Sequence, residues 1–199
     1  MSAAVIIIER IERLARISAY PWNLTRRIFS PQQSEAEALV IGWMEEAGLS
    51  TRRDPVGNLI GRIEGSIPGG PAIVVGGHID TRKDAGRYDG TLGVPIGIAA
   101  VENVIRGGSP LRHAIEVVAF VTDAAGRFGL PRFGSRAVVR RIDPDLLGLD
   151  DDYGVALREA LQSQGLAPEM PPSARRSPDE IVAYLEVAAE AGPALELSG

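Results

Sequence analysis

One histidine and three aspartates gather around a single short segment of the chain. The apolar residues 72–75, followed by two glycines, are typical of a buried strand. His78 and Asp80 come at its carboxyl end, where open α/β sheets bind their ligands, and the next loop adds Asp84 and Asp89. An imidazole among carboxylates suits a metal site or acid–base catalysis, although loop aspartates also serve simply as turn formers.

His78 and Asp80 should point to the same side of an extended segment, because side chains alternate along it. A carboxylate beside an imidazole fixes its tautomer and stabilises its charged form, so the pair predicts an acid–base unit that needs no metal. On the following loop, Tyr88 and Asp89 are expected to contact the substrate. The alternative is that His78 serves packing and that Tyr88 and Asp89 have no chemical role.

A second loop is expected beside the first. Residues 114–121 form an apolar run interrupted only by Glu116, which predicts another inner strand. Asp123 and Arg127 follow it, and they join the expected substrate-binding residues if the two strands are parallel neighbours. Arginine suits an anionic substrate group, although most surface arginines contact only solvent. The second histidine, His113, stands at the strand's entry and is expected to be structural.

The remaining elements position these loops. Helical periodicity and capping residues predict helices, and short apolar segments between turns predict two further strands. The expected helices cover residues 3–17, 31–47, 94–106, 133–142 and 151–164, and the expected strands cover 50–54 and 58–64. Residues 177–187 begin with a capping-box pattern and stay open between helix and strand. The alternation predicts an α/β fold, with a mostly parallel sheet flanked by helices in a single domain, residues 1–199.

Composition narrows the classes of partner. The net charge of −5 and isoelectric point near 5.2 argue against nucleic-acid binding, which favours basic surfaces. The chain has no cysteine, which excludes disulfides and thiolate metal sites and fits a reducing compartment. The apolar residues 3–8 are too few to span a membrane and lack the pattern of a signal peptide. We therefore expect a cytoplasmic protein with neither nucleic acid nor membrane as a partner.

With both loops in view, the chain resembles the N-carbamoyl-amino-acid hydrolase and allantoate amidohydrolase branch of the zinc aminopeptidase-like amidohydrolases. The resemblance is collinear over most of the chain. It rests on residues 54–59, 77–81, 88–94, 133–137, 154–161, 183–186 and 192–193. It implies a zinc-peptidase-like catalytic domain, truncated because the chain ends before the family's dimerisation (lid) domain.

The resemblance also implies roles for the residues of the first loop. In the family, two divalent metals activate a water molecule against an amide or ureido carbon. His78 matches a ligand of one metal, Asp89 the carboxylate that bridges both, and Asp80 the acidic residue that orients the histidine.

Three other positions depart from the family pattern. Ala124 stands where the family has its general base, a glutamate, and Ala125 and Ala188 stand where it has two metal ligands. A catalytic zinc usually takes three protein ligands, and losing a general base costs about 10²–10⁴-fold in rate. We therefore expect no metal or other cofactor, with His78 and Asp89 as remnants of the metal site.

Three functions remain open. The first is a repurposed enzyme that uses His78 and Asp80 for metal-independent chemistry on a small polar, amino-acid-like substrate. The second is a catalytically inactive protein that binds a ligand or a partner, and the third is a metal-dependent amide or ureido hydrolase completed by another chain. Because the shortened domain should leave a sheet edge exposed, we also expect a homodimer or a complex with another subunit. The expected contact surface is the N-terminal helix or the tail after Ser177.

Overall fold

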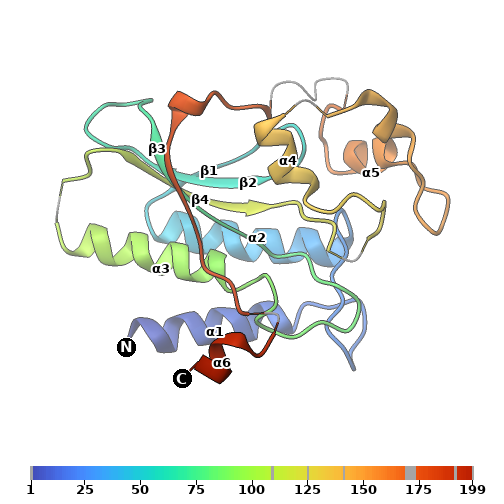
Figure 1. The fold of residues 1–199 in the computed structure, drawn as a ribbon, viewed down its shortest axis with the longest axis horizontal. Coiled ribbons are helices and arrows are strands. Elements are labelled where there is room, and N and C mark those ends of the chain that lie inside the picture. Colours follow the sequence, from blue (N-terminus) through green and yellow to red (C-terminus); the bar gives the residue numbers. More distant parts are fainter. Residues whose placement is uncertain are drawn as a thin grey trace.

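The computed structural model describes residues 2–108, 110–124, 126–140, 142–168, 174–190 and 192–198. Within these residues the chain forms a five-stranded sheet in the order β1-β2-β4-β3-β5 (Figure 1). The strands are β1 (Ser50–Arg53), β2 (Leu59–Ile63), β3 (Ala72–His78), β4 (Ala114–Phe120) and β5 (Ile181–Glu186). The helices are α1 (Ala3–Ala15), α2 (Pro31–Glu46), α3 (Gly93–Arg106), α4 (Phe133–Val139), α5 (Leu157–Ser163) and α6 (Ala194–Ser198).

The sheet is mixed. Strand β3 pairs in parallel with both β4 and β5, whereas β1 pairs antiparallel with β2 and β2 pairs antiparallel with β4. The α/β class and the flanking helices are confirmed, but a mostly parallel sheet was too strong an expectation. The short turn between β1 and β2 folds them into a hairpin, so these two strands are antiparallel, and β2 also runs opposite to its other neighbour, β4.

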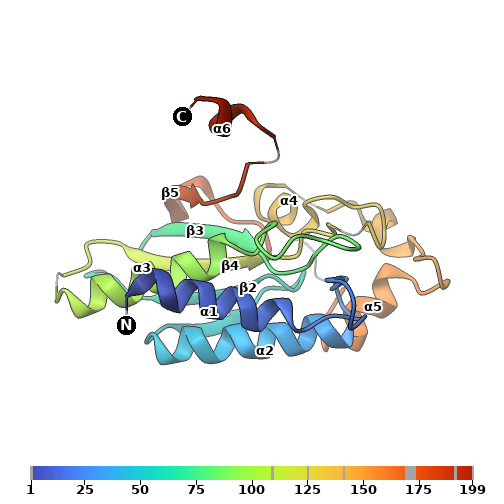
Figure 2. The same ribbon diagram turned by 90° about the horizontal axis from the view of Figure 1, so that it is seen from below.

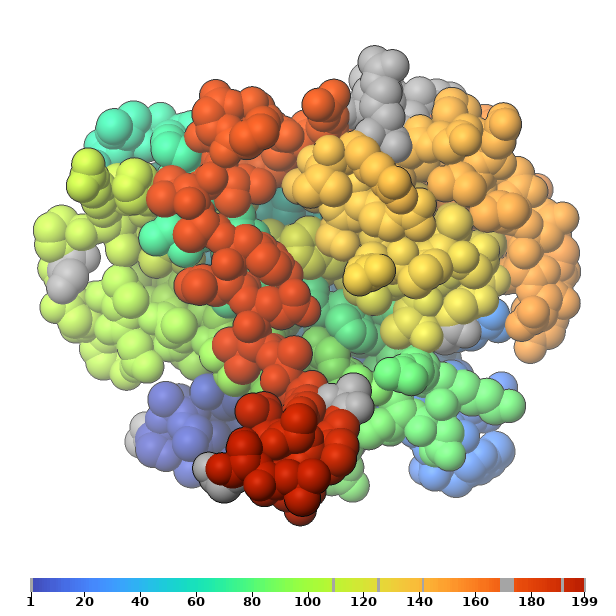
Figure 3. Space-filling view, in the orientation of Figure 1, coloured from blue at the N-terminus to red at the C-terminus, as the bar shows by residue number. Residues whose placement is uncertain are grey.

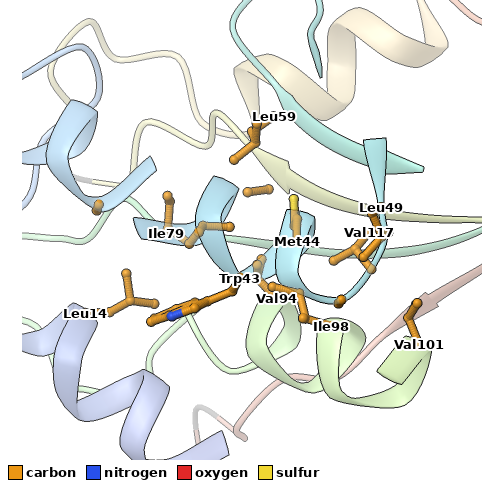
Figure 4. Close-up of a cluster of buried hydrophobic side chains, with 14 residues drawn as sticks. Leu14, Trp43, Met44, Leu49, Leu59, Ile79, Val94, Ile98, Val101 and Val117 are labelled. Carbon is orange, nitrogen blue, oxygen red and sulfur yellow. The ribbon is translucent and has the colours of Figure 1, made fainter. Parts of the chain in front are cut away.

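Helices α1, α2 and α3 lie on one side of the sheet, as Figure 2 shows. Between α2, α3 and the sheet, the main core packs Trp43, Met44, Leu59, Ile98 and Val117 (Figure 4). A second apolar cluster is formed by residues of α4, α5 and the loop after β4, and it includes Phe128, Phe133, Leu157 and Leu161. It holds this loop in place. No helix in the described part of the chain has the length and apolar character needed to cross a bilayer.

Local signals located the second helix accurately. The side chain of Ser30 accepts a hydrogen bond from the backbone of Gln33, and Pro31 is the first helical residue. The chain leaves the helix through Gly48, which has a left-handed φ of +83°. This helix therefore confirms the prediction to within a residue.

Two predicted helices are shorter than expected, and the segment left open is resolved. Helix α4 ends at Val139, and α5 begins only at Leu157 because the side chain of Asp151 accepts the N–H groups of Tyr153 and Val155 in a turn. The capping box after Ser177 is present, but it closes only the short 3₁₀ turn Pro178–Glu180. The following residues form β5, because parallel pairing with β3 satisfies their backbone groups. The segment left open between helix and strand is thus a strand.

Candidate functional site

The parallel pairing of β3 with β4 brings the two predicted loops to one edge of the sheet. His78 is the last residue of β3 and lies opposite Phe120, the last residue of β4. The loops that follow, residues 79–92 and 121–132, therefore leave the sheet side by side, as the sequence predicted. Strand β3 is longer than the predicted residues 72–75, because the two glycines continue the ladder up to His78.

The imidazole of His78 has a defined tautomer. Its Nδ1 lies 2.7 Å from the backbone carbonyl oxygen of Asp80. A carbonyl only accepts hydrogen bonds, so Nδ1 carries the hydrogen, and in the neutral ring Nε2 then has the lone pair. The carboxylate of Asp80 is 3.6 Å from Nδ1, beyond hydrogen-bond distance. Orientation of the ring thus comes from the carbonyl of Asp80 rather than from its carboxylate, which corrects the sequence-based expectation.

The carboxylate of Asp80 joins the two loops. It is fully buried and accepts hydrogen bonds from the backbone N–H groups of Thr122, at 3.1 Å, and Ala124, at 2.8 Å. Burial raises the pKa of Asp80, and the nearby His78 and these two amides oppose part of the increase. Asp80 therefore acts as a rigid connection between the strand ends and places a carboxylate close to the imidazole.

Arg26 supports the same loop, a role that could not be predicted because residues 24–29 resemble a plain connector. Its side chain is fully buried and donates to the carbonyls of Ile79, Leu14 and Ile17 at 2.7–2.8 Å. Burial lowers the pKa of Arg26 to about 10, while the charge of Asp80 acts in the opposite direction. The guanidinium thus ties α1 to the backbone immediately after His78.

Gly90 closes over the ring of His78. Its carbonyl accepts the backbone N–H of His78 at 3.2 Å, and its φ of +76° is left-handed. A Cβ atom at this position would lie 1.8 Å from Nε2. The backbone of Gly90 therefore lies against the Nε2 edge, while one fifth of the His78 side chain remains exposed. Any ligand of Nε2 must approach beside this glycine.

Tyr88 and Asp89 lie on the exposed part of the first loop. Tyr88 is 45% exposed, and the half-exposed carboxylate of Asp89 lies 3.7 Å from Nε of Arg82. Such an exposed pair contributes little stability. Their predicted contact with substrate stays a prediction.

Asp123 and Arg127 hold the second loop in shape. The buried Asp123 has a left-handed φ of 55° and accepts the N–H groups of residues 127, 128 and 130. Arg127 donates to the carboxylate of Asp151 at 2.9 Å and to the carbonyls of Ile28 and Phe29. Through these contacts, both residues help to hold the structure of the chain. Their role in substrate binding stays a prediction.

The donors at this edge do not fit a two-metal centre. Among the residues that the structure describes, no three His, Cys, Asp or Glu side chains lie close enough to hold a metal ion. Ala124 offers its backbone N–H to Asp80 but has no side-chain donor, and Ala188 is exposed beyond β5. Ala125, the third replaced position, lies outside the described residues. The ligand set left by His78 and Asp89 falls short of the usual three.

A separate cleft of about 1020 Å³ lies on the sheet face opposite α1–α3. Its floor is apolar and includes Val74, Val118 and Phe120. At one end the buried Glu116 accepts from Arg62, at 2.9 Å, and from Arg176. Neither histidine lines this cleft, although Phe120, which lies opposite His78 in the β3–β4 ladder, is part of its floor.

Comparison of the sequence with known proteins identifies relatives. The chain is 38% identical over 192 residues to an N-carbamoyl-L-amino acid amidohydrolase of Geobacillus stearothermophilus, covering 96% of this chain and 47% of that protein. It is 34% identical over 196 residues to an allantoate deiminase of Arabidopsis thaliana, covering 96% of this chain and 37% of that protein. No family model matches.

Solved structures show the same relationship. The crystal structure of AtUAH in complex with (S)-hydroxyglycine matches with a TM-score of 0.91 and 30% identity, over 100% of this chain and 48% of that one. A hydantoinase/carbamoylase family amidase from Burkholderia ambifaria matches with a TM-score of 0.86 and 28% identity, again over 100% and 48%. The resemblance to carbamoylases and allantoate amidohydrolases is confirmed, and the chain spans about half the length of the relatives it matches.

Proposed function

We propose that this homologue of N-carbamoyl-amino-acid amidohydrolases and allantoate deiminases acts on a small polar, amino-acid-like molecule, with His78 as a metal-independent acid–base. One observation carries the proposal: the bond from Nδ1 of His78 to the carbonyl of Asp80 leaves Nε2 as a proton acceptor at the carboxyl end of β3. General bases require a fixed lone pair of this kind. The relatives indicate the substrate class, which is N-carbamoyl-amino acids and allantoate.

The arrangement can support hydrolysis of a ureido group. As the water oxygen bonds to the ureido carbon, Nε2 takes a proton from the water, and it returns this proton to the leaving nitrogen as the carbon–nitrogen bond breaks. The buried Asp80 lies 3.6 Å from the ring, where its carboxylate stabilises the transiently charged imidazolium. The N–H groups of Thr122 and Ala124 hold this carboxylate in place, and Arg26 holds the adjacent backbone through the carbonyl of Ile79.

The test compares His78→Gln with His113→Gln, because these are the two histidines of the chain. Release of ammonia from N-carbamoyl-L-amino acids and from allantoate is measured with and without chelator. We expect His78→Gln to abolish turnover, His113→Gln to retain it, and chelator to have no effect. Full activity in His78→Gln would refute the role of the histidine. Loss of activity on chelation alone would show that a metal performs the chemistry.

A second function, ligand binding without turnover, is favoured by the position of Gly90. Its backbone lies against Nε2, and Ala124 offers no base of its own. In that case the same compounds raise the melting temperature of the protein, and this stabilisation is weaker in His78→Gln, while no product forms. Turnover by the wild type rules this alternative out.

A further inference from the structure

We propose that Arg26 and Thr81 are positioning residues for His78, because their pairing fixes the carbonyl that accepts the hydrogen of its Nδ1. This carbonyl belongs to the peptide group between Asp80 and Thr81. The same group carries the N–H of Thr81, which donates to the carbonyl of Arg26 at 2.8 Å. A peptide group is planar and its N–H points opposite to its C=O, so holding one end fixes the direction of the other.

Arg26 and Thr81 are joined by two hydrogen bonds. Besides the bond from the N–H of Thr81, the backbone N–H of Arg26 donates to Oγ1 of Thr81 at 2.8 Å. The guanidinium adds a contact to the same stretch of backbone, because its Nε donates to the carbonyl of Ile79 at 2.8 Å. Arg26 therefore holds both of the peptide groups that flank Asp80.

These contacts are shielded from water by the described residues themselves. The exposed fractions of Arg26 and Thr81 are 0% and 1%. Figure 3 shows the first loop, in green, beside the blue N-terminal segment that carries Arg26, and a bond from the N–H of Asp84 to Oγ1 of Thr25 joins the same two segments. Because water cannot replace a lost partner here, each of these bonds is costly to leave unmade.

The contacts form a continuous path from α1 to the imidazole. The guanidinium of Arg26 donates to the carbonyls of Leu14, in the last turn of α1, and of Ile17, just after it. Hydrogen bonds in a chain polarise one another, so the bond from Thr81 to Arg26 strengthens the carbonyl of Asp80 as an acceptor. A stronger acceptor keeps the hydrogen on Nδ1 and leaves the lone pair of the neutral ring on Nε2.

The test is Thr81→Val, which replaces the hydroxyl by a methyl group and leaves the N–H of Arg26 without its acceptor. Thr81→Ser keeps the hydroxyl and should behave like the wild type. Thr25→Val is the matched control, because Thr25 is also buried and its hydroxyl also accepts one N–H of the first loop, that of Asp84, farther along the chain. It removes a bond of the same kind without touching the peptide groups beside Asp80.

The ¹⁵N NMR signals of the histidine rings report the tautomer at about pH 8.5, where an ordinary histidine is neutral. The spectrum of His78→Gln identifies the signals of His78. In the wild type, Thr81→Ser and Thr25→Val, these should be well separated, with the hydrogen on Nδ1. In Thr81→Val they should move toward each other as the second tautomer becomes populated, while those of His113 stay in place.

Two NMR results would overturn the proposal. One is a wild-type ring of His78 with its hydrogen on Nε2, and the other is a folded Thr81→Val variant whose ring signals match those of the wild type. Circular dichroism shows whether each variant is folded. Thr81→Ala removes the same acceptor and takes the place of Thr81→Val if that variant does not fold.

A kinetic measurement follows, and this part rests on the proposed function. One buried hydrogen bond biases two arrangements of a segment by about fivefold or more. The kcat of Thr81→Val for an N-carbamoyl-L-amino acid should therefore fall by about fivefold or more, with KM little changed. A wild type without turnover refutes the proposed function, and the NMR comparison still decides the positioning role. In an active enzyme, an unchanged kcat in Thr81→Val would overturn the positioning role as well.

Discussion

Replacing Asp80 by asparagine changes one oxygen of the site into an amino group while its size stays nearly the same. In the wild type, Oδ1 accepts the N–H of Thr122 and Oδ2 accepts the N–H of Ala124. Asparagine has one oxygen and can accept only one of them, and its amino group then faces the other N–H. The substitution therefore separates the connecting role of Asp80 from any general effect on packing.

The structure sets the size of the effect. A buried N–H left without an acceptor costs about 1–3 kcal/mol, and the carboxylate contacts are charge-assisted, which favours the upper half of that range. Burying the charged carboxylate is itself unfavourable, which is why burial raises the pKa of Asp80. A neutral asparagine avoids this cost, so the net destabilisation is smaller. We expect Asp80→Asn to lower the free energy of unfolding by about 1–2 kcal/mol near neutral pH.

The pH dependence has a defined sign. Since the folded-state pKa of Asp80 lies above its ordinary value of 3.8, the folded chain binds more protons than the unfolded chain in that interval. The contribution of Asp80 to stability therefore falls as pH rises from the ordinary value through the raised one. Asparagine does not titrate, so the stability difference between wild type and variant should be largest in acid and shrink as the pH rises.

Urea denaturation of both proteins between about pH 4 and pH 8 measures this difference. Asp84→Asn is the matched control, because Asp84 is an exposed aspartate of the same loop and its left-handed φ of 56° suits asparagine equally well. Turnover should fall less in Asp80→Asn than in His78→Gln, because the carbonyl of Asp80 still orients the ring. A destabilisation that matches the control, or one that grows as the pH rises, would refute the reasoning.

Two further predictions concern other contacts. Gly90→Ala should destabilise the protein by at least about 1–2 kcal/mol through its left-handed backbone alone. It should also displace the ring of His78, which histidine NMR signals report. Gly86→Ala is the control, because a Cβ there would make only an ordinary contact with Asp89, at 4.0 Å. Glu116→Gln should cost about 3 kcal/mol in urea denaturation, the lower end for breaking a buried ion pair, because Arg62 retains a second carboxylate partner. An unchanged NMR spectrum in the first case, or unchanged stability in the second, would contradict these assignments.

Where neighbours in sequence decide the structure, the sequence predicted it well. Ser30, Pro31 and Gly48 set the limits of α2 through contacts within a few residues of themselves. Prediction failed where a distant group decided. Asp151 turns the chain where helical periodicity continues, and it is held by Arg127 from another loop. The residues after the capping box at Ser177 become a strand because β3 offers a free edge.

In the site, too, features set by nearby residues were predicted, whereas features set by distant groups were not. The placement of His78 at a strand end followed from apolar patterning, and the meeting of the two loops followed from the expected parallel pairing. The bond to the carbonyl of Asp80 could not be predicted, because it depends on how the chain bends after β3. Arg26 was missed because its acceptors, at Leu14, Ile17 and Ile79, lie far apart in sequence.

The way Asp80 holds the second loop does not depend on the side chain at position 124, where the resemblance implies a general base and this chain has alanine. The loop is bound through the backbone N–H groups of Thr122 and Ala124, which any side chain at position 124 leaves in place. Asp123 likewise organises the rest of the loop through backbone N–H groups. Many small metal sites fold only when the metal is bound. Here contacts within the chain position the loops, so the edge that carries His78 can persist, and acquire different chemistry, without a metal to assemble it.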